Sequence, residues 1–391
     1  MNNPIFLENN KFLIEENCKE VIDILVFQLK NISNAFYFAC LIRKKNIQIY
    51  KYSYETKSIK KIGKLDVISS HCNSMKYFYN PLNKQEYFFI INDNNEITIY
   101  LIKNEDNCKL IQKLNYINND DINNNNNNIL NITDDDTDSM GGGGGTFTDF
   151  NFLDVVYNQN DKNVYIIISY LIMKNGGSES SFDYYNAKSN NIFIFKDDKL
   201  NLIKTFKFDV DFDMNNLIYI NKDSDKKYLI NADQTNDLIL IELKSNYDNY
   251  KVENFFKDNN NKNQLANFIR SQCSHQSCIV YGKNNFDYLY IFGSNKLMII
   301  NFTEKKVDKI IDEIIDFKQY YITTIHNWNN NFIIFFQYET LYIYDINNNK
   351  IITQYKKDKC TLFQNYSFPD KNETLGIFQS KDKIECYFVK N

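Results

Sequence analysis

Histidine and arginine are the scarcest of the residues on which catalytic and nucleic-acid-binding sites depend. The 391-residue chain has three His and only two Arg, Arg43 and Arg270. With only three imidazole groups, the chain has few candidate residues for metal binding or for acid–base catalysis. Guanidinium groups that fork to bases and phosphates are almost absent, and 45 basic residues face 49 acidic ones. These shortages argue against a metal, a cofactor or a nucleic-acid partner.

Long apolar runs and export signals are also lacking. No apolar stretch approaches the roughly 18 residues of a membrane span, and the longest, 163–173, has polar interruptions. The first residues lack the basic start and apolar stretch of a secretory signal. The eight Cys follow no disulfide-framework spacing, which is typical of reduced thiols. We therefore expect a cytoplasmic or nuclear protein without a transmembrane segment.

Aromatic and β-branched residues are abundant and recur at intervals. Phe, Tyr and Trp make up 16% of the chain. A four-residue apolar block returns at Ile47–Tyr50, Ile97–Tyr100, Ile192–Phe195, Leu238–Ile241, Leu297–Ile300, Leu341–Tyr344 and Ile384–Tyr387. The start-to-start spacings are 50, 95, 46, 59, 44 and 43 residues, and the longest contains an insertion rich in Asn, Asp and Gly. Such a period indicates a repeat architecture.

Each apolar block is the third strand of a predicted sheet. A second β-branched and aromatic run lies about ten residues upstream, and a weaker alternating segment follows an Asn-, Asp- and Lys-rich turn. The repeat unit is therefore a four-stranded antiparallel sheet with strands a to d. A sheet this narrow cannot bury two apolar faces alone, whereas units packed in a ring can. We predict an all-β, seven-bladed β-propeller in which residues 1–391 form one domain.

The two chain ends are predicted to close the ring. The last unit, from Cys360, supplies strands a, b and c only. The segment Ile5–Ile14 precedes the first full unit at Val21 and is expected to pair as the missing outer strand. The insertion 117–146 is expected to be disordered because it combines an Asn run, an acidic run and five glycines. Helical periodicity is nearly absent from the rest of the chain.

Several residues resemble a known family. Leu341–Asp345 ends on an aromatic residue followed by Asp, as strand c does in WD-repeat β-propellers. Ser70-His71 and Ser274-His275 are similar to the Gly-His element before strand a. The resemblance implies the propeller fold and transfers no functional residue. The family's Asp in the b–c turn is replaced in every unit, by Lys44, Asn94, Ser189, Thr235, Ser294, Tyr338 and Lys381.

Three motifs could carry chemistry, and each has a simpler interpretation. Cys273–Cys278 contains His275, but strand alternation points Cys278 away from Cys273 and His275, so a metal site is disfavoured. Asp134–Asp138 lacks the Gly and Glu of a calcium loop. Gly141–Gly145 has no Gly-Lys-Ser/Thr after it and is interpreted as a flexible joint. Lysine pairs such as Lys226-Lys227 are interpreted as solvated hairpin charges.

One face of the disc is the predicted binding surface. In such blades the d–a and b–c connections share a face, and three long segments fall on it: 117–146, 172–191 and 257–272. We expect a protein or peptide partner there, with Tyr184, Tyr185, Phe268 and Arg270 as anchors.

The predicted function is that of a non-catalytic interaction scaffold or a subunit of a larger complex. One alternative is a phosphoinositide-binding propeller, although Phe268-Ile269-Arg270-Ser271 lacks the second Arg of that motif. A propeller enzyme is the other alternative, which would need convergent carboxylates, His or metal ligands at the central channel.

Overall fold

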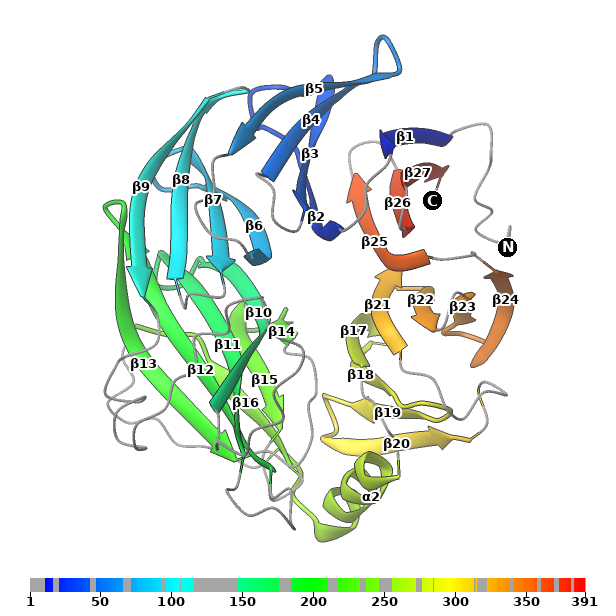
Figure 1. Cartoon of the computed structure of the whole chain (residues 1–391). Coiled ribbons are helices and arrows are strands. Elements are labelled where there is room, and N and C mark those ends of the chain that lie inside the picture. The colour runs from blue at the N-terminus through cyan, green and yellow to red at the C-terminus, as the bar shows by residue number, and fades with distance from the viewer. Residues whose placement is uncertain are drawn as a thin grey trace.

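Seven antiparallel sheets form a ring around a central axis in the computed structural model (Figure 1). The predicted seven-bladed propeller is thereby confirmed. The structure describes residues 11–16, 21–42, 47–65, 72–92, 96–105, 107–115, 146–175, 184–209, 217–232, 237–245, 255–271, 276–283, 285–312, 314, 322–328, 330–337, 340–356, 360–368, 373–380 and 383–390. The insertion 117–145 and both Ser-His elements lie outside these residues.

Blades are numbered here from Val21 in chain order. Blade 1 contains β2 (Val21–Phe27), β3 (Ala35–Ile42), β4 (Ile47–Ser53) and β5 (Ser58–Leu65). Blade 2 contains β6 (Cys72–Asn80), β7 (Gln85–Asn92), β8 (Glu96–Asn104) and β9 (Asn107–Asn115). Blade 3 contains β10 (Thr146–Asn158), β11 (Asn163–Asn175), β12 (Tyr184–Lys196) and β13 (Lys199–Asp209).

The second half of the ring repeats this order. Blade 4 contains β14 (Leu217–Asn221), β15 (Lys226–Ala232) and β16 (Leu238–Glu242), and blade 5 contains β17 (Gln276–Lys283), β18 (Phe286–Phe292), β19 (Leu297–Asn301) and β20 (Lys306–Ile311). Blade 6 contains β21 (Ile322–Trp328), β22 (Phe332–Gln337), β23 (Thr340–Asp345) and β24 (Lys350–Lys356). Blade 7 contains β25 (Cys360–Phe368), β26 (Glu373–Ser380), β27 (Lys383–Lys390) and, from the other chain end, β1 (Lys11–Glu16).

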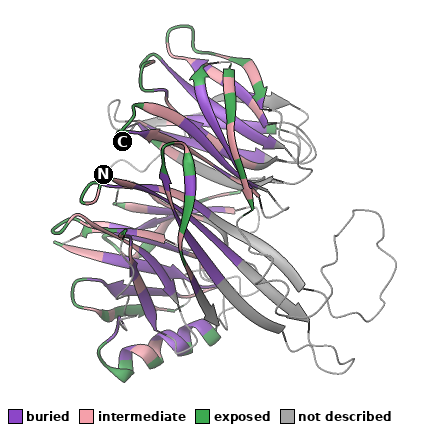
Figure 2. Ribbon diagram, turned by 90° about the vertical axis from the view of Figure 1, so that its left-hand side faces the viewer, coloured by how far each residue is buried: buried purple, intermediate pink, exposed green. Residues whose placement is uncertain are grey.

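Apolar side chains fill every junction between neighbouring blades. Seven buried clusters occur, and each combines residues of two adjacent blades. In the junction of blades 7 and 1, for example, Phe36 and Phe38 pack with Leu375 and Ile377. Figure 2 shows buried segments along the middle of the strands and exposed residues at many of the turns. Each sheet thus hides both faces against its neighbours, as the repeat pattern predicts.

The ring closes through the predicted pairing of the chain ends. Strand β1 pairs antiparallel with β27, with Lys11 opposite Tyr387 and Phe12 opposite Cys386. Ile14 is buried in the junction of blades 7 and 1. The prediction is confirmed for residues 11–14, whereas residues 5–10 lie outside the described part.

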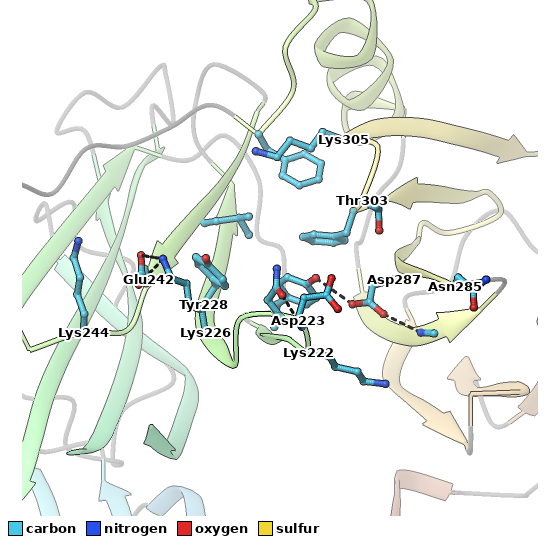
Figure 3. Close-up of a pocket in the computed structure, with 16 residues that line it drawn as sticks. Lys222, Asp223, Lys226, Tyr228, Glu242, Lys244, Asn285, Asp287, Thr303 and Lys305 are labelled. Carbon is cyan, nitrogen blue, oxygen red and sulfur yellow. Dashed lines mark hydrogen bonds and ion pairs between the residues drawn. The ribbon is translucent and has the colours of Figure 1, made fainter. Parts of the chain in front are cut away.

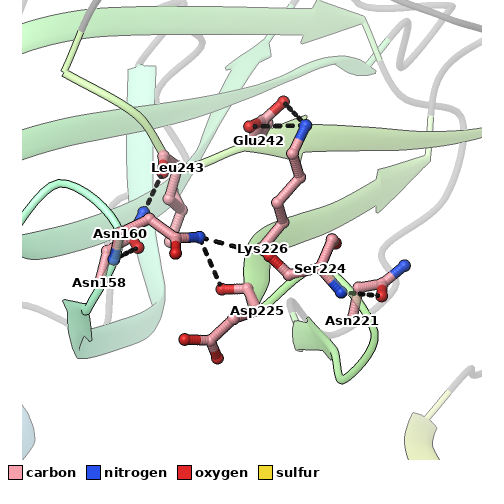
Figure 4. Close-up of polar contacts among 8 residues, drawn as sticks. All are labelled: Asn158, Asn160, Asn221, Ser224, Asp225, Lys226, Glu242 and Leu243. Carbon is pink, nitrogen blue, oxygen red and sulfur yellow. Dashed lines mark hydrogen bonds and ion pairs between the residues drawn. The ribbon is translucent and has the colours of Figure 1, made fainter.

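Asparagine side chains link neighbouring blades at the a–b turns. Asn158 Oδ1 accepts from Asn160 N at 3.0 Å, while its Nδ2 donates to Leu243 O of blade 4 at 2.8 Å (Figure 4). Asn160 Nδ2 donates to Ser224 O and Asp225 O at 3.4 and 3.3 Å. The Asn residues therefore form the turns, for which their side chains are well suited, and also join blade 3 to blade 4.

A helix occupies a segment that the sequence analysis treats as a connection. Helix α2 (Asn259–Arg270) lies between blades 4 and 5, and Asp258 caps it by accepting from Asn261 N at 2.8 Å. Its apolar side packs into the junction of blades 4 and 5, and Asn261 Oδ1 accepts from Val307 N of β20 at 2.7 Å. Burial of that side outweighs the weak helix propensity of an Asn-rich first turn. Among the described residues, this helix is too short and too polar to span a bilayer.

Candidate functional site

The two predicted tyrosine anchors lie at the start of a strand. Tyr184 and Tyr185 begin β12 and pair with Asn175 and Lys174 of β11. The segment 172–191 was expected to be a long connection, but β11 continues to Asn175 and β12 starts at Tyr184. That expectation is wrong for most of the segment because its residues continue the ladder. The two tyrosine side chains lie outside the part of the structure that is described.

Blade 3 is longer than the other blades. Strands β10, β11 and β12 have 13 residues each, against 8, 7 and 5 for β17, β18 and β19 of blade 5 (Figure 1). Six extra residues extend a strand by about 20 Å. The additional pairs run from the middle of the blade to Asn175 and Tyr184, at the b–c end. The extension therefore rises on the d–a/b–c face.

The other two predicted anchors belong to α2 and differ in exposure. Phe268 is 3% exposed and packs with Leu265 and Ile269 among core residues of blades 4 and 5. Arg270 is exposed at the last position of the helix. The structure thus gives Phe268 a packing role within the chain and leaves the Arg270 side chain accessible.

A cavity that the sequence analysis did not predict lies between blades 4 and 5. Its volume is about 740 Å³, and the turns that line it are a–b and c–d turns, which lie on the side opposite the predicted binding surface. Figure 3 shows the lining residues. The lining residues come from the a–b turn of blade 4, the a–b and c–d turns of blade 5, and the strands beside them: Tyr219, Asn221, Lys222, Asp223, Lys226, Tyr228, Leu240, Glu242, Lys244, Phe255, Gly282, Asn285, Asp287, Phe302, Thr303 and Lys305.

Aromatic rings form the inner wall of the cavity. The Tyr219 ring stacks on Phe302 with centroids 4.8 Å apart, and on Tyr228 at 6.1 Å. Phe302 in turn contacts Phe255 at 4.9 Å. Because these rings also belong to the core between the two blades, the wall is held rigidly by packing.

One carboxylate is fixed against this wall. Asp287 accepts from the Tyr219 hydroxyl at 3.1 Å and from Gly282 N at 2.8 Å. Gly282 has φ +67°, a conformation that glycine adopts without strain. Burial raises the pKa of Tyr219, and the negative charges of Asp287 and Asp223 raise it further. Both carboxylates therefore act on the same hydroxyl.

The lysines of the cavity are held at its margins. Lys226 pairs with Glu242 at 3.3 Å, which raises the pKa of Lys226. Lys222 lies over the Tyr281 ring, 5.1 Å from its centroid, and Lys305 lies 5.9 Å from the centroid of Phe255. The adjacent Lys227 donates to Tyr157 O, and burial lowers its pKa. The interpretation of Lys226-Lys227 as solvated charges is therefore wrong for Lys227, whereas Lys226 is a half-exposed charge paired with Glu242.

The chemistry available here is that of binding. The site offers aromatic faces, two neighbouring carboxylates, and ammonium groups around the opening. Within the described part of the chain, no group of three or more His, Cys, Asp or Glu is placed to hold a metal ion. Asp223 and Asp287 belong to different repeat units, and they line one cavity because of how the two units pack.

Comparisons with known proteins identify the fold. No family profile and no curated sequence matches the chain. Solved structures match over almost the whole length, among them the AfRom2 CNH domain with 9% identity, a TM-score of 0.52, and coverage of 98% of this chain and 99% of that one. Sqt1 of Saccharomyces cerevisiae matches with 7% identity, TM-score 0.51, and coverage of 97% and 98%. BBS1N, solved in complex with ARL6DN, matches with 9% identity, TM-score 0.54, and coverage of 96% and 95%. At such identities the chain shares their fold, a β-propeller.

Proposed function

We propose that this propeller is a non-catalytic protein-interaction scaffold, a subunit of a larger assembly, which holds a protein partner on its d–a/b–c face. The extension of blade 3 is the observation that carries the proposal. Strands β10 to β12 rise beyond the neighbouring blades while keeping their backbone pairs. A paired extension on a rigid ring presents its tip to a partner with little loss of conformational freedom.

The position of the two tyrosines supports this surface. Tyr184 and Tyr185 are the first residues of β12, and Tyr is enriched among the residues that dominate binding energy. Arg270, exposed in the connection between blades 4 and 5, is the third anchor of the same face. Phe268 contributes by fixing the helix that carries Arg270. The propeller BBS1N, whose structure contains ARL6DN, is an example of this fold with a protein partner.

A non-catalytic role is supported by the titrating groups of the cavity. The pKa of Tyr219 is raised by burial and by the carboxylates, and the pKa of Lys226 is raised by Glu242. Both changes move these groups away from neutral pH, where general acid–base catalysis is most effective.

The relation to WD-repeat propellers is part of the same proposal. Asp345 ends β23 and holds the turn that follows through Asn347 and Asn348. The Asp after the strand c aromatic therefore has a defined structural use in this blade, as expected for a diverged WD-type unit.

The test compares two tyrosine variants of the tagged full-length protein. Partners recovered with the wild type are quantified by mass spectrometry, and the main partner is then titrated in purified form. We expect Tyr184→Ala/Tyr185→Ala to weaken this partner's affinity at least about tenfold. Tyr79→Ala, at the a–b end of β6, is the matched control and should leave the affinity unchanged.

Two results would contradict the proposal. One is an unchanged affinity of the double variant in a protein whose circular dichroism matches wild type. The other is binding to phosphoinositide vesicles in place of a protein, measured by flotation, which would favour the membrane-binding alternative.

A further inference from the structure

The cavity between blades 4 and 5 has the size and the wall of a ligand site. Its volume of about 740 Å³ falls within the range typical of small-ligand and side-chain pockets. Its lining comes from the a–b/c–d side of the blades, so that it can be occupied independently of a partner on the opposite face.

The carboxylates Asp287 and Asp223 line this cavity, and Asp287 is hydrogen-bonded to the Tyr219 hydroxyl. Asp287 is held by two donors, the Tyr219 hydroxyl and Gly282 N, which leaves each of its oxygens able to accept a further hydrogen bond. Asp223 lines the same cavity, and its charge acts on the same hydroxyl. Two negative charges in this position favour a cationic group between them.

Lys222, Lys226, Lys244 and Lys305 line the same cavity. None of them forms an ion pair with Asp223 or Asp287. Lys226 is paired with Glu242, and Lys222 is placed over the Tyr281 ring. Asp287 is therefore oriented before any ligand arrives.

The aromatic rings of the cavity wall favour a guanidinium over an ammonium group. Of these rings Tyr228 is half-buried and offers part of its surface to the cavity, whereas Tyr219 and Phe302 are buried by mutual stacking. A planar guanidinium stacks on an aromatic face and at the same time donates two parallel hydrogen bonds to a carboxylate, whereas an ammonium acts as a point charge. The lysines at the opening repel a peptide that is basic throughout and attract acidic flanking residues.

We propose that this cavity binds the arginine side chain of a short peptide segment in which acidic residues flank the arginine. The guanidinium contacts Asp287 and Asp223 and lies against the half-buried Tyr228 ring, while Lys222 and Lys305 at the margin meet the flanking carboxylates. This site adds a second, sequence-selective contact to the scaffold.

Fluorescence anisotropy with a defined peptide tests the proposal. The probe is fluorescein-labelled Gly-Glu-Arg-Glu-Gly, titrated with the purified full-length protein, and the control peptides carry citrulline or lysine at the centre. We expect the citrulline peptide to bind at least about tenfold more weakly, because citrulline keeps the shape and loses the charge, and the lysine peptide to bind with intermediate affinity.

Protein variants locate the binding in the cavity. Asp287→Asn and Asp223→Asn should each weaken the arginine peptide about tenfold, whereas Asp308→Asn, an exposed carboxylate of β20 outside the cavity, should not. Asp223 lies in an exposed turn, so its variant remains informative if Asp287→Asn unfolds. Tyr184→Ala/Tyr185→Ala should bind the peptide normally, so that this proposal and the proposed function can fail separately.

Three results of these titrations would overturn the proposal, and a fourth comes from an all-acidic peptide. The three are equal affinity for the arginine and citrulline peptides, wild-type affinity in Asp223→Asn, and no saturable binding of the arginine peptide at millimolar concentration. Preferential binding of an all-acidic peptide would also exclude it, because the marginal lysines would then be the binding groups.

Discussion

Single polar residues hold the strand ends of this propeller. Asp345, the last residue of β23, accepts from Asn347 N at 2.8 Å, from Asn348 N at 3.0 Å and from Asn348 Nδ2 at 2.7 Å. Burial by itself would raise the pKa of this carboxyl, but the hydrogen bonds outweigh burial, so that the pKa is lowered. The ionised form of Asp345 is therefore more stable in the folded chain than in the unfolded chain.

Replacing Asp345 by Ala should lower the free energy of unfolding by about 1–2 kcal/mol at pH 7, because the turn loses its acceptor. Since the folded pKa is depressed, this contribution is complete above the unfolded pKa of about 3.9 and is lost as the pH falls through the folded value. Urea unfolding of wild type and Asp345→Ala at several pH values between 7 and 3 measures the difference. Asp308→Ala is the control, and a difference that grows below pH 4 would contradict the argument.

At the scale of elements, the sequence analysis predicted the strands and missed the helix. Blocks such as Leu297–Ile300 alternate with polar turns, and their period alone indicates the sheets. In α2 the apolar residues Leu265, Ala266, Phe268 and Ile269 have helical spacing after a capping Asp258, which was a usable signal. The Asn-rich first turn was interpreted as part of a loop, because Asn favours turns. The helix is stabilised mainly by packing between two blades, which the local sequence does not show.

The two predicted anchors in α2 can be separated by their effect on stability. Phe268→Ala removes a side chain that is 3% exposed and should cost about 3–5 kcal/mol of unfolding free energy, because a cavity remains in the core. Arg270→Ala, at an exposed site, should stay within about 0.5 kcal/mol of wild type. Urea denaturation measures both. Equal effects would mean that the helix is not packed as described.

The cavity could not be predicted from the sequence, because residues of two different repeat units form it. Asp223 lies in a turn of one unit and Asp287 at the start of strand β18 of the next, 64 positions apart in the sequence, and each alone resembles part of an ordinary solvated hairpin. Their meeting beside Tyr219 follows from the packing of blade 4 against blade 5. That the d–a and b–c connections share one face could be inferred from the antiparallel order of the strands. The greater length of blade 3 could not be inferred, and it is known only from the pairing of its strands in the structure.

At the scale of the whole molecule, stability depends on joining the two chain ends. Each blade buries its faces only against its neighbours, so the junction of blades 7 and 1 must be as complete as the others. Phe36, Leu375 and Ile384 are buried there, together with Ile14 from β1. An open ring would expose this cluster to water and leave β27 as an unpaired edge.

An engineered disulfide between β1 and β27 tests the closure directly. Phe12 lies opposite Cys386, and paired antiparallel residues have Cα atoms about 4.5–5.5 Å apart, which suits a disulfide. Phe12→Cys, made in a Cys40→Ser background because Cys40 is near Cys386, should form this bond on mild oxidation. Thiol labelling should then find two fewer free thiols than in the reduced protein, and urea unfolding should show about 2–4 kcal/mol of added stability.

The controls are Cys40→Ser alone and Cys40→Ser/Phe12→Cys/Cys386→Ser. If the number of free thiols in the folded, oxidised protein does not fall, β1 does not pair with β27 in this register and the ring is not closed as described.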